Sequence, residues 1–400
     1  MSTHNPRRFA TPEHLKRLDS KILIQFLLPF ESYLKTKGIH LKSYDNQPIK
    51  YEFLSSVLLN ANEDMPVELS DALYFVNEMS SDDKIDILLD AARDNKIEIV
   101  GGPDITPMDI AARLWIVNSD ILESLHAETL VSKPKSFEHF RSADKPPKTL
   151  PVPDSETILK MQNDFDEWFI ANKRGGSCKV FPFDHGRKLC LLVRHGKPFK
   201  REGSLTNGES QTILYRPESY DVIIYDHQDN ELAINGSVTK GEKTLYLEVI
   251  GRHLFGKDDY FLNETKYSLE PLLKDGAMSL VCTDVSGIDG IKLIQIKRYL
   301  GGAHGDKETI DSKDYFSSKS WDGEISPAKP LVSATFAIHF ENTKRARTVR
   351  IVPPNKAIYE RDDDSVLVEN LLKARGFIML PKIHEEVQHE VVIKEAMGCN

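Results

Sequence analysis

The stretch Lys173–Lys197, KRGGSCKVFPFDHGRKLCLLVRHGK, separates a part of the chain with helical periodicity from a part with strand periodicity. Before it, apolar residues recur every three or four positions, which is the spacing of one helix face. After Gly175-Gly176 the period shifts toward two, which is the spacing of a half-buried strand. The sequence therefore predicts an α+β fold, with an N-terminal helical domain followed by a larger domain built on an antiparallel sheet.

The first 132 residues carry repeated helix signals. One apolar stripe at helical spacing comprises Leu15, Leu18, Ile22, Leu23, Phe26 and Leu27. Residues 80–83 offer N-cap oxygens, and Thr106-Pro107 supplies a cap followed by a first-turn proline. We therefore predict a helical interaction domain over residues 1–132, interrupted by one short strand at residues 96–100.

A DNA-reading helix is the alternative for this domain, because two helices followed by a short strand are typical of a winged helix. The second helix would be residues 82–95, DDKIDILLDAARDN, which hold five acidic residues against two basic ones. Phosphates would be repelled by such a helix, since phosphate contacts normally dominate nucleic-acid affinity. The sequence favours a docking or oligomerisation domain.

Prolines mark the boundary that follows. Residues 133–154 contain Pro134, Pro146, Pro147, Pro151 and Pro153, which remove backbone donors and disfavour helix just before them. This composition predicts a linker. It separates the helical domain from an α+β domain over residues 155–380, and residues 381–400 are predicted to form a C-terminal tail.

The strand-rich domain is predicted from alternating patterns and short polar breaks. Strands are expected at residues 179–182, 188–195, 211–215, 221–225, 231–234, 244–250, 279–283, 291–297, 333–339 and 347–352. Helices are expected near residues 269–273 and 365–375. Breaks such as residues 226–230 and 240–242 are typical of hairpins, so the sheet is predicted to be antiparallel.

Composition limits the location and the partners. No apolar run reaches the roughly 18 residues of a membrane span, and the first residues lack the apolar block of a secretory signal. The four cysteines show no paired-motif spacing, which favours a reducing compartment. We predict a cytoplasmic protein without membrane contact. Its net charge of −9 means that a nucleic-acid partner would require a local basic patch.

Basic residues concentrate in two short segments. Nine lie between Lys173 and Arg201 against the single acid Asp184, and phenylalanines are interleaved among them. A second cluster, KRARTVR, occupies residues 344–350. Cations with interleaved aromatic rings are typical of a polyanion-binding surface, although solvated strand faces over core phenylalanines are the alternative. The predicted nucleic-acid-binding residues are Lys173, Arg174, Arg187, Lys188, Arg194, Lys197, Lys200, Arg201, Lys344, Arg345 and Arg347.

The segment LLVRHGKP, residues 191–198, resembles the motif of histidine phosphatases, in which an Arg-His-Gly turn ends the first strand. The resemblance implies His195 as the phosphate carrier, and it covers only these eight residues. The family also needs a second arginine on an early helix and a second histidine. Arg216 lies before a proline, outside any helical pattern, while His253 and His304 are the remaining candidates for the second histidine.

Two sets of residues could supply metal ligands. One is Cys178, His185, Cys190 and His195; the other is Asp221, Asp226 and Glu248. The first suits tetrahedral zinc by residue type, but Cys190 and His195 are an odd number of positions apart and point to opposite faces of a strand. Nothing in the spacing of the second set requires an ion. We predict no metal ligands and leave cofactors and catalysis undecided.

These patterns together predict a cytosolic nucleic-acid-associated accessory protein that acts with partner proteins. Nucleic acid would contact the two basic segments, and residues 1–132 would mediate protein–protein interaction or self-association. Bacterial antiviral defence against mobile DNA is a hypothesis about the setting that rests on no single residue. The alternative function is phosphoester hydrolysis, by a phosphatase based on His195 or by a metal-dependent nuclease.

Overall fold

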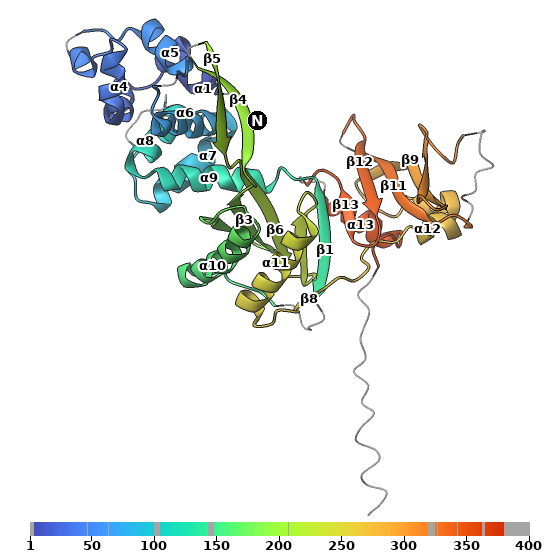
Figure 1. Cartoon of the computed structure of the whole chain (residues 1–400). Coiled ribbons are helices and arrows are strands. Elements are labelled where there is room, and N and C mark those ends of the chain that lie inside the picture. Colours follow the sequence, from blue (N-terminus) through green and yellow to red (C-terminus); the bar gives the residue numbers. More distant parts are fainter. Residues whose placement is uncertain are drawn as a thin grey trace, which may run out of the picture. The chain divides into compact units, whose positions relative to one another are not determined.

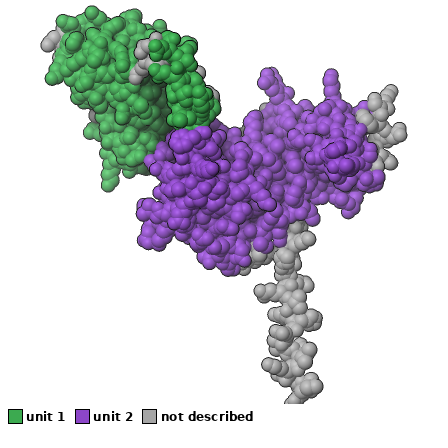
Figure 2. Space-filling model, in the orientation of Figure 1, with its two compact units in different colours: residues 1–130, 200–215 green, residues 131–199, 216–400 purple. Residues whose placement is uncertain are grey.

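The computed structural model describes residues 4–45, 47–62, 64–99, 105–142, 148–206, 208–318, 325, 327–341, 343–361 and 365–379. The chain divides into two compact units, which Figure 2 shows in different colours. Unit 1 comprises Met1–Leu130 and Lys200–Tyr215, and unit 2 comprises Val131–Phe199 and Arg216–Asn400. The first unit is mainly helical and the second contains a large antiparallel sheet, so the predicted α+β class is confirmed.

Unit 1 is built from short helices around one apolar core that includes Phe26, Leu34 and Leu73. Its α-helices are α1 (Arg7–Ala10), α2 (Pro12–Leu15), α3 (Ser20–Leu27), α4 (Glu31–Thr36), α5 (Tyr51–Leu59), α6 (Val67–Met79), α7 (Ile85–Asp94), α8 (Pro107–Val117) and α9 (Ser119–Val131). The predicted cap at Thr106 is confirmed, because its side chain accepts from the Asp109 amide in a reciprocal capping box. Residues 96–99 of the expected strand form no strand, and Val100 lies outside the described residues.

A β-hairpin from the middle of the chain also belongs to unit 1. Its strands, β4 (Lys200–Thr206) and β5 (Glu209–Tyr215), form a separate two-stranded sheet. Leu205 and Leu214 are largely exposed on it. The chain therefore leaves unit 2 after Phe199 and returns to it at Arg216.

Unit 2 contains an 11-stranded sheet in the order β10-β9-β11-β12-β13-β1-β7-β6-β3-β2, with β8 paired to β1. The strands are β1 (Ser136–Ser142), β2 (Lys179–His185), β3 (Lys188–Gly196), β6 (Glu218–Asp226), β7 (Glu231–Asn235), β8 (Phe261–Leu262), β9 (Ile288–Gly301), β10 (Asp306–Asp311), β11 (Leu331–Phe340), β12 (Arg347–Val352) and β13 (Lys356–Ile358). Strand β1 lies between β13 and β7, so it joins the two halves of the sheet (Figure 1).

Strand β1 lies inside the stretch that we expected to be a proline-rich linker. Phe137 and Phe140 bury their rings, but His139 and Arg141 are buried as well. Because polar side chains occupy buried positions of β1, its sequence lacks the alternation of apolar and polar residues that predicts a strand. Residues 143–147 and the expected tail, residues 381–400, lie outside the described residues, and the functional division into domains stays a prediction.

Two other predicted strands are wrong. Residues 244–250 belong to helix α11 (Lys240–Ile250), and residues 279–283 overlap a 3-10 turn at Gly276–Leu280. The break expected at residues 240–242 is the first turn of α11, where Thr239 and Glu242 form a capping box. The apolar residues at 245, 247 and 249 have the spacing of a strand. The buried residues of α11, Leu245, Tyr246, Val249 and Ile250, have the spacing of a helix face.

Helices cover each half of the sheet and create two apolar cores. Helices α10 (Ser155–Ala171) and α11 pack on β3 and β6, and their core includes Phe165 and Ile223. Helices α12 (Glu270–Lys274) and α13 (Ser365–Ala374) contribute to the core of the C-terminal half, which includes Phe336. Within the described ranges, no helix has both the length and the apolar character needed to cross a membrane.

Candidate functional site

The first basic segment is extensively paired with acidic side chains. Arg174 contacts Glu242, Lys200 contacts Glu202, and Arg187 lies 2.9 Å from both Asp226 and Asp229. Arg194 Nε lies 3.9 Å from a Glu218 oxygen. Each pair neutralises charge locally, so this segment offers less positive potential to a polyanion than its sequence suggests.

Other cations of that segment are divided between the two units. Lys173 follows α10, Lys188 begins β3, and Lys197 is exposed after β3, all in unit 2. Arg201 lies on the hairpin of unit 1, where it donates to Thr212. The segment is therefore not one continuous basic strip within a single unit.

The second basic segment borders a concave surface on unit 2 with a volume of about 1210 Å³. We call this surface the basic face and define it by its cations Lys135, Lys313, Arg345, Arg347 and Arg350. Its lining contains two acidic residues, Asp311 and Glu360. Lys344 is exposed in the turn before β12. Cations from segments far apart in the sequence therefore meet here.

Strand pairing builds the floor of the basic face. Thr335 on β11 pairs with Arg350 on β12 and with Gln295 on β9, and Gln295 pairs with Asp311 on β10. Their neighbours in sequence, such as Phe336, belong to the core on the opposite side of the sheet. The result is a row of polar side chains across four strands, open on one side.

Hydrogen bonds fix the cations at the edge of this floor. Arg347 lies 3.3 Å and Lys135 lies 2.5 Å from Glu360, so one carboxylate forms ion pairs with two cations. Arg350 donates to Ser333 over 3.1 Å. A surplus of cations over carboxylates remains, which suits phosphate or another multiply charged anion.

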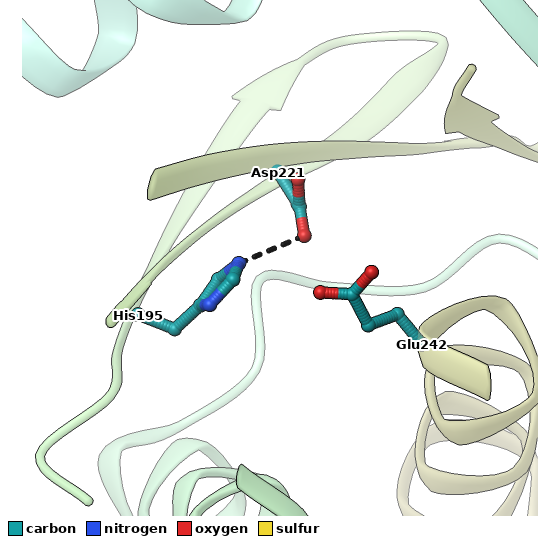
Figure 3. Close-up of side chains that lie close together, drawn as sticks. All are labelled: His195, Asp221 and Glu242. Carbon is teal, nitrogen blue, oxygen red and sulfur yellow. Dashed lines mark hydrogen bonds and ion pairs between the residues drawn. The ribbon is translucent and has the colours of Figure 1, made fainter. Parts of the chain in front are cut away.

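A second polar site is buried beneath α10 and α11. His195 lies at the end of β3, Asp221 lies on β6, and Glu242 lies in the first turn of α11 (Figure 3). His195 shares a strand face with Val193 and Leu191, and Asp221 shares one with Ile223. The three residues are 3–4% exposed, and their potential ligand atoms lie within 4.8 Å of one another.

The geometry of this site is held by several further contacts. His195 Nε2 lies 3.0 Å from Asp221 Oδ2, which also accepts from the Tyr246 hydroxyl over 2.7 Å. The other ring nitrogen of His195 lies 2.9 Å from the Gly196 carbonyl oxygen. The imidazole stacks on Phe169 with ring centroids 4.4 Å apart. Arg174 contacts Glu242.

These contacts bear on the phosphatase alternative. A phosphate carrier must present one imidazole nitrogen to the phosphate, whereas both nitrogens of His195 have partners and the ring is buried. His253 instead lies 2.9 Å from Asp164 of α10, and Arg216 stacks on Phe199. The geometry therefore offers little support for His195 as a nucleophile.

The structure brings together a different ligand set from the two that we considered. Cys190 lies 3.8 Å from His185, while Cys178 contacts the Gln162 carbonyl instead of joining them. Asp226 binds Arg187, and Glu248 is exposed on α11. Among the described residues, the group His195, Asp221 and Glu242 is the one with suitable geometry for an ion. The capping-box spacing from Thr239 to Glu242 could have revealed α11 and thereby Glu242.

A second buried cluster, around His139 on β1, was not predicted. His139 Nδ1 lies 2.6 Å from Glu231, and Lys266 Nζ lies 2.5 Å from the same carboxylate oxygen. Burial and the nearby Lys266 lower the pKa of His139 to about 4. Burial alone would raise the pKa of Glu231, but Lys266 and His139 lower it below its usual range. The cluster links β1, β7 and the segment before α12.

Comparisons with known proteins add no assignment, because the chain matches no protein-family model and none of the curated proteins.

Proposed function

We propose that the chain is a nucleic-acid-associated accessory protein and that the basic face of unit 2 is its main contact with the phosphate backbone. The observation that supports this proposal is the concentration of five cations against two acids around one concave surface. Phosphate contacts supply most of the sequence-independent affinity for nucleic acids, and they need cations that are not fully neutralised within the protein.

The overall charge sharpens this argument. The chain carries a formal net charge of −9, so a surface with this average charge would repel nucleic acid. A local surplus of cations can still bind phosphates because interactions between exposed charges are screened beyond about 8–10 Å at moderate ionic strength. We therefore assign the first basic segment a secondary role, with Lys197 and Arg201 as its exposed members.

The helical unit suits the accessory part of the proposal. It has its own apolar core and presents α-helices and a hairpin with exposed leucines, which are features that a protein partner or a second copy could use. A cytoplasmic location and a setting in bacterial defence against mobile DNA belong to the same proposal. Phosphoester hydrolysis is the alternative function.

Salt-dependent binding tests the proposal. Fluorescence anisotropy of the full chain with labelled single- and double-stranded oligonucleotides should show affinity that falls steeply with salt. The double variant Lys313→Glu/Arg345→Glu alters two exposed cations of the basic face. It should reduce the slope of log affinity against log salt by about two units if both contact phosphates.

Two matched double variants provide the controls. Lys21→Glu/Lys42→Glu reverses two exposed charges of unit 1 and should leave binding nearly unchanged. Lys197→Glu/Arg201→Glu tests the first basic segment and should have the smaller effect of the two basic segments. Equal binding by wild type and Lys313→Glu/Arg345→Glu would remove the basic face from the proposal. Cleavage of the oligonucleotides, lost with His195→Gln, would favour the hydrolase instead.

A further inference from the structure

We infer that His195, Asp221 and Glu242 form a binding site for one divalent transition-metal ion. One imidazole and two carboxylates converge from β3, β6 and α11, as Figure 3 shows. All three side chains are almost completely buried. Burying two carboxylates close together is unfavourable unless cations or hydrogen-bond donors compensate them, and a divalent cation does so with a single atom.

The surroundings of His195 provide an independent observation. A carbonyl oxygen can only accept, so the ring nitrogen facing Gly196 carries hydrogen and donates over 2.9 Å. In a neutral imidazole the second nitrogen, Nε2, then has a lone pair, and it lies 3.0 Å from the Asp221 carboxylate. In that neutral form, two acceptors face each other. A metal ion bound by both atoms satisfies them, and a second hydrogen on the ring is the alternative.

The arrangement matches that of metal-binding histidines, which commonly donate their outer nitrogen to a carbonyl or carboxylate. Tyr246 donates to Asp221, and the Thr239 amide donates to Glu242 over 2.7 Å. Arg174 holds the other Glu242 oxygen. Because a carboxylate oxygen has two lone pairs, these bonds can orient the ligands and still leave lone pairs for an ion.

The donor set indicates the class of ion. Imidazole nitrogen favours Zn²⁺ and neighbouring transition metals over Ca²⁺ or Mg²⁺, and two carboxylates also suit Mn²⁺. Tetrahedral zinc with bonds near 2.1 Å places its ligands about 3.4 Å apart. The distance of 3.0 Å between His195 and Asp221 is close to that separation, and the group lies within 4.8 Å.

The His139 cluster shows what such a site looks like when a protein side chain supplies the cation. There, Lys266 Nζ lies 2.5 Å from Glu231 and 3.1 Å from His139. A lysine therefore contacts both the imidazole and the carboxylate, which themselves lie 2.6 Å apart. At the His195 site, Arg174 contacts the third residue, Glu242.

Metal titration of the full chain tests the inference. After chelator treatment and dialysis, calorimetry with Zn²⁺ should show one tight site per chain, Mn²⁺ should compete, and Mg²⁺ should not. Asp221→Asn and Glu242→Gln should each weaken Zn²⁺ binding at least tenfold. Gln at position 242 also preserves the capping box. The matched control is Glu231→Gln, which alters a buried carboxylate beside the other histidine and should leave Zn²⁺ affinity unchanged.

Nitrogen-15 spectra of histidine-labelled wild-type protein give a readout that does not depend on a variant folding. With Zn²⁺ present, Nε2 of His195 should show the chemical shift of a metal-bound nitrogen. Absence of tight Zn²⁺ binding, or affinity unchanged in both Asp221→Asn and Glu242→Gln, would overturn the inference. So would hydrogen on both ring nitrogens of His195 in the zinc-treated protein, because the site would then be a histidine–aspartate ion pair.

Discussion

His139 and His195 are both buried histidines beside a carboxylate in unit 2, but their other neighbours differ in charge. His139 faces Lys266 and Arg361, whose Nη2 lies 3.4 Å from the histidine Nε2. His195 faces the Gly196 carbonyl and Asp221, which are both acceptors. Besides its carboxylate partner, the first ring therefore contacts two cations, whereas the second contacts a carbonyl oxygen.

This difference decides what each histidine can do. Next to cations, the imidazole is held neutral, in agreement with the pKa of about 4 for His139. Its role is to connect buried charges within a folded core. Where both ring nitrogens face oxygens, one donates its hydrogen and the other needs a second hydrogen or an ion. Residue type alone does not separate these roles, whereas the charge of the neighbours does.

Removal of the Lys266 ammonium group should have the largest effect on stability. Lys266→Met leaves the Glu231 carboxylate buried beside His139 without its closest cation, so we expect a loss of about 3–5 kcal/mol in the free energy of unfolding. Urea unfolding measures it. The exposed control Lys21→Met should change the free energy by less than about 0.5 kcal/mol. A similarly small loss in Lys266→Met would show that the cluster does not depend on this lysine.

Acid should produce the next largest effect. The pKa of His139 is lowered from 6.5 to about 4, so the unfolded chain binds a proton more readily than the folded chain between these values. Stability from this group is fully present above pH 6.5 and is lost as the pH falls toward 4. The loss should reach about 3 kcal/mol at pH 4.

The lowered pKa of Glu231 acts in the same direction at lower pH, because its stabilising contribution is lost when the carboxylate is protonated. Urea unfolding from pH 7 to pH 4 measures the His139 effect, and its extension below pH 4 measures the Glu231 effect. His139→Gln should flatten the curve between pH 6.5 and pH 4.5. An unchanged slope in that variant would assign the acid sensitivity to other groups.

Loss of the Tyr246 hydroxyl should have the smallest effect. Tyr246→Phe removes one hydrogen bond to the buried Asp221 carboxylate and should lower the free energy of unfolding by about 1.5 kcal/mol. Tyr299→Phe, at an exposed position on β9, is the control. Equal stability of Tyr246→Phe and wild type would mean that another donor or an ion satisfies Asp221, which would itself sharpen the contrast with Glu231.

Most of the fold could be predicted where one face of an element is apolar. Strands β3 and β11 lie where short apolar runs predict strands, and the cap at Thr106 marks the start of α8. The prediction failed where burial and polarity disagree. Strand β1 buries His139 and Arg141, and α11 carries apolar residues in a pattern that also fits a strand.

The candidate sites were less predictable because they depend on register and on distant contacts. His195 attracted attention for its Arg-His-Gly motif, and Asp221 was considered with other acids, but their meeting depends on the pairing of β3 with β6. Glu242 was hidden in a turn that proved to be a helix start. The basic face needs β9 to β13 side by side, which no local pattern of residues 344–350 reveals.

The assignment of hairpin β4–β5 to unit 1 has a consequence for synthesis on the ribosome. The helices of this unit emerge first, but its last strand emerges only after Tyr215 has been made. By then β1, β2 and β3 of unit 2 have already left the ribosome, while most of their sheet partners have not. The usual order, in which an N-terminal domain is completed before the next begins, therefore does not apply, and the two units must mature in overlapping stages.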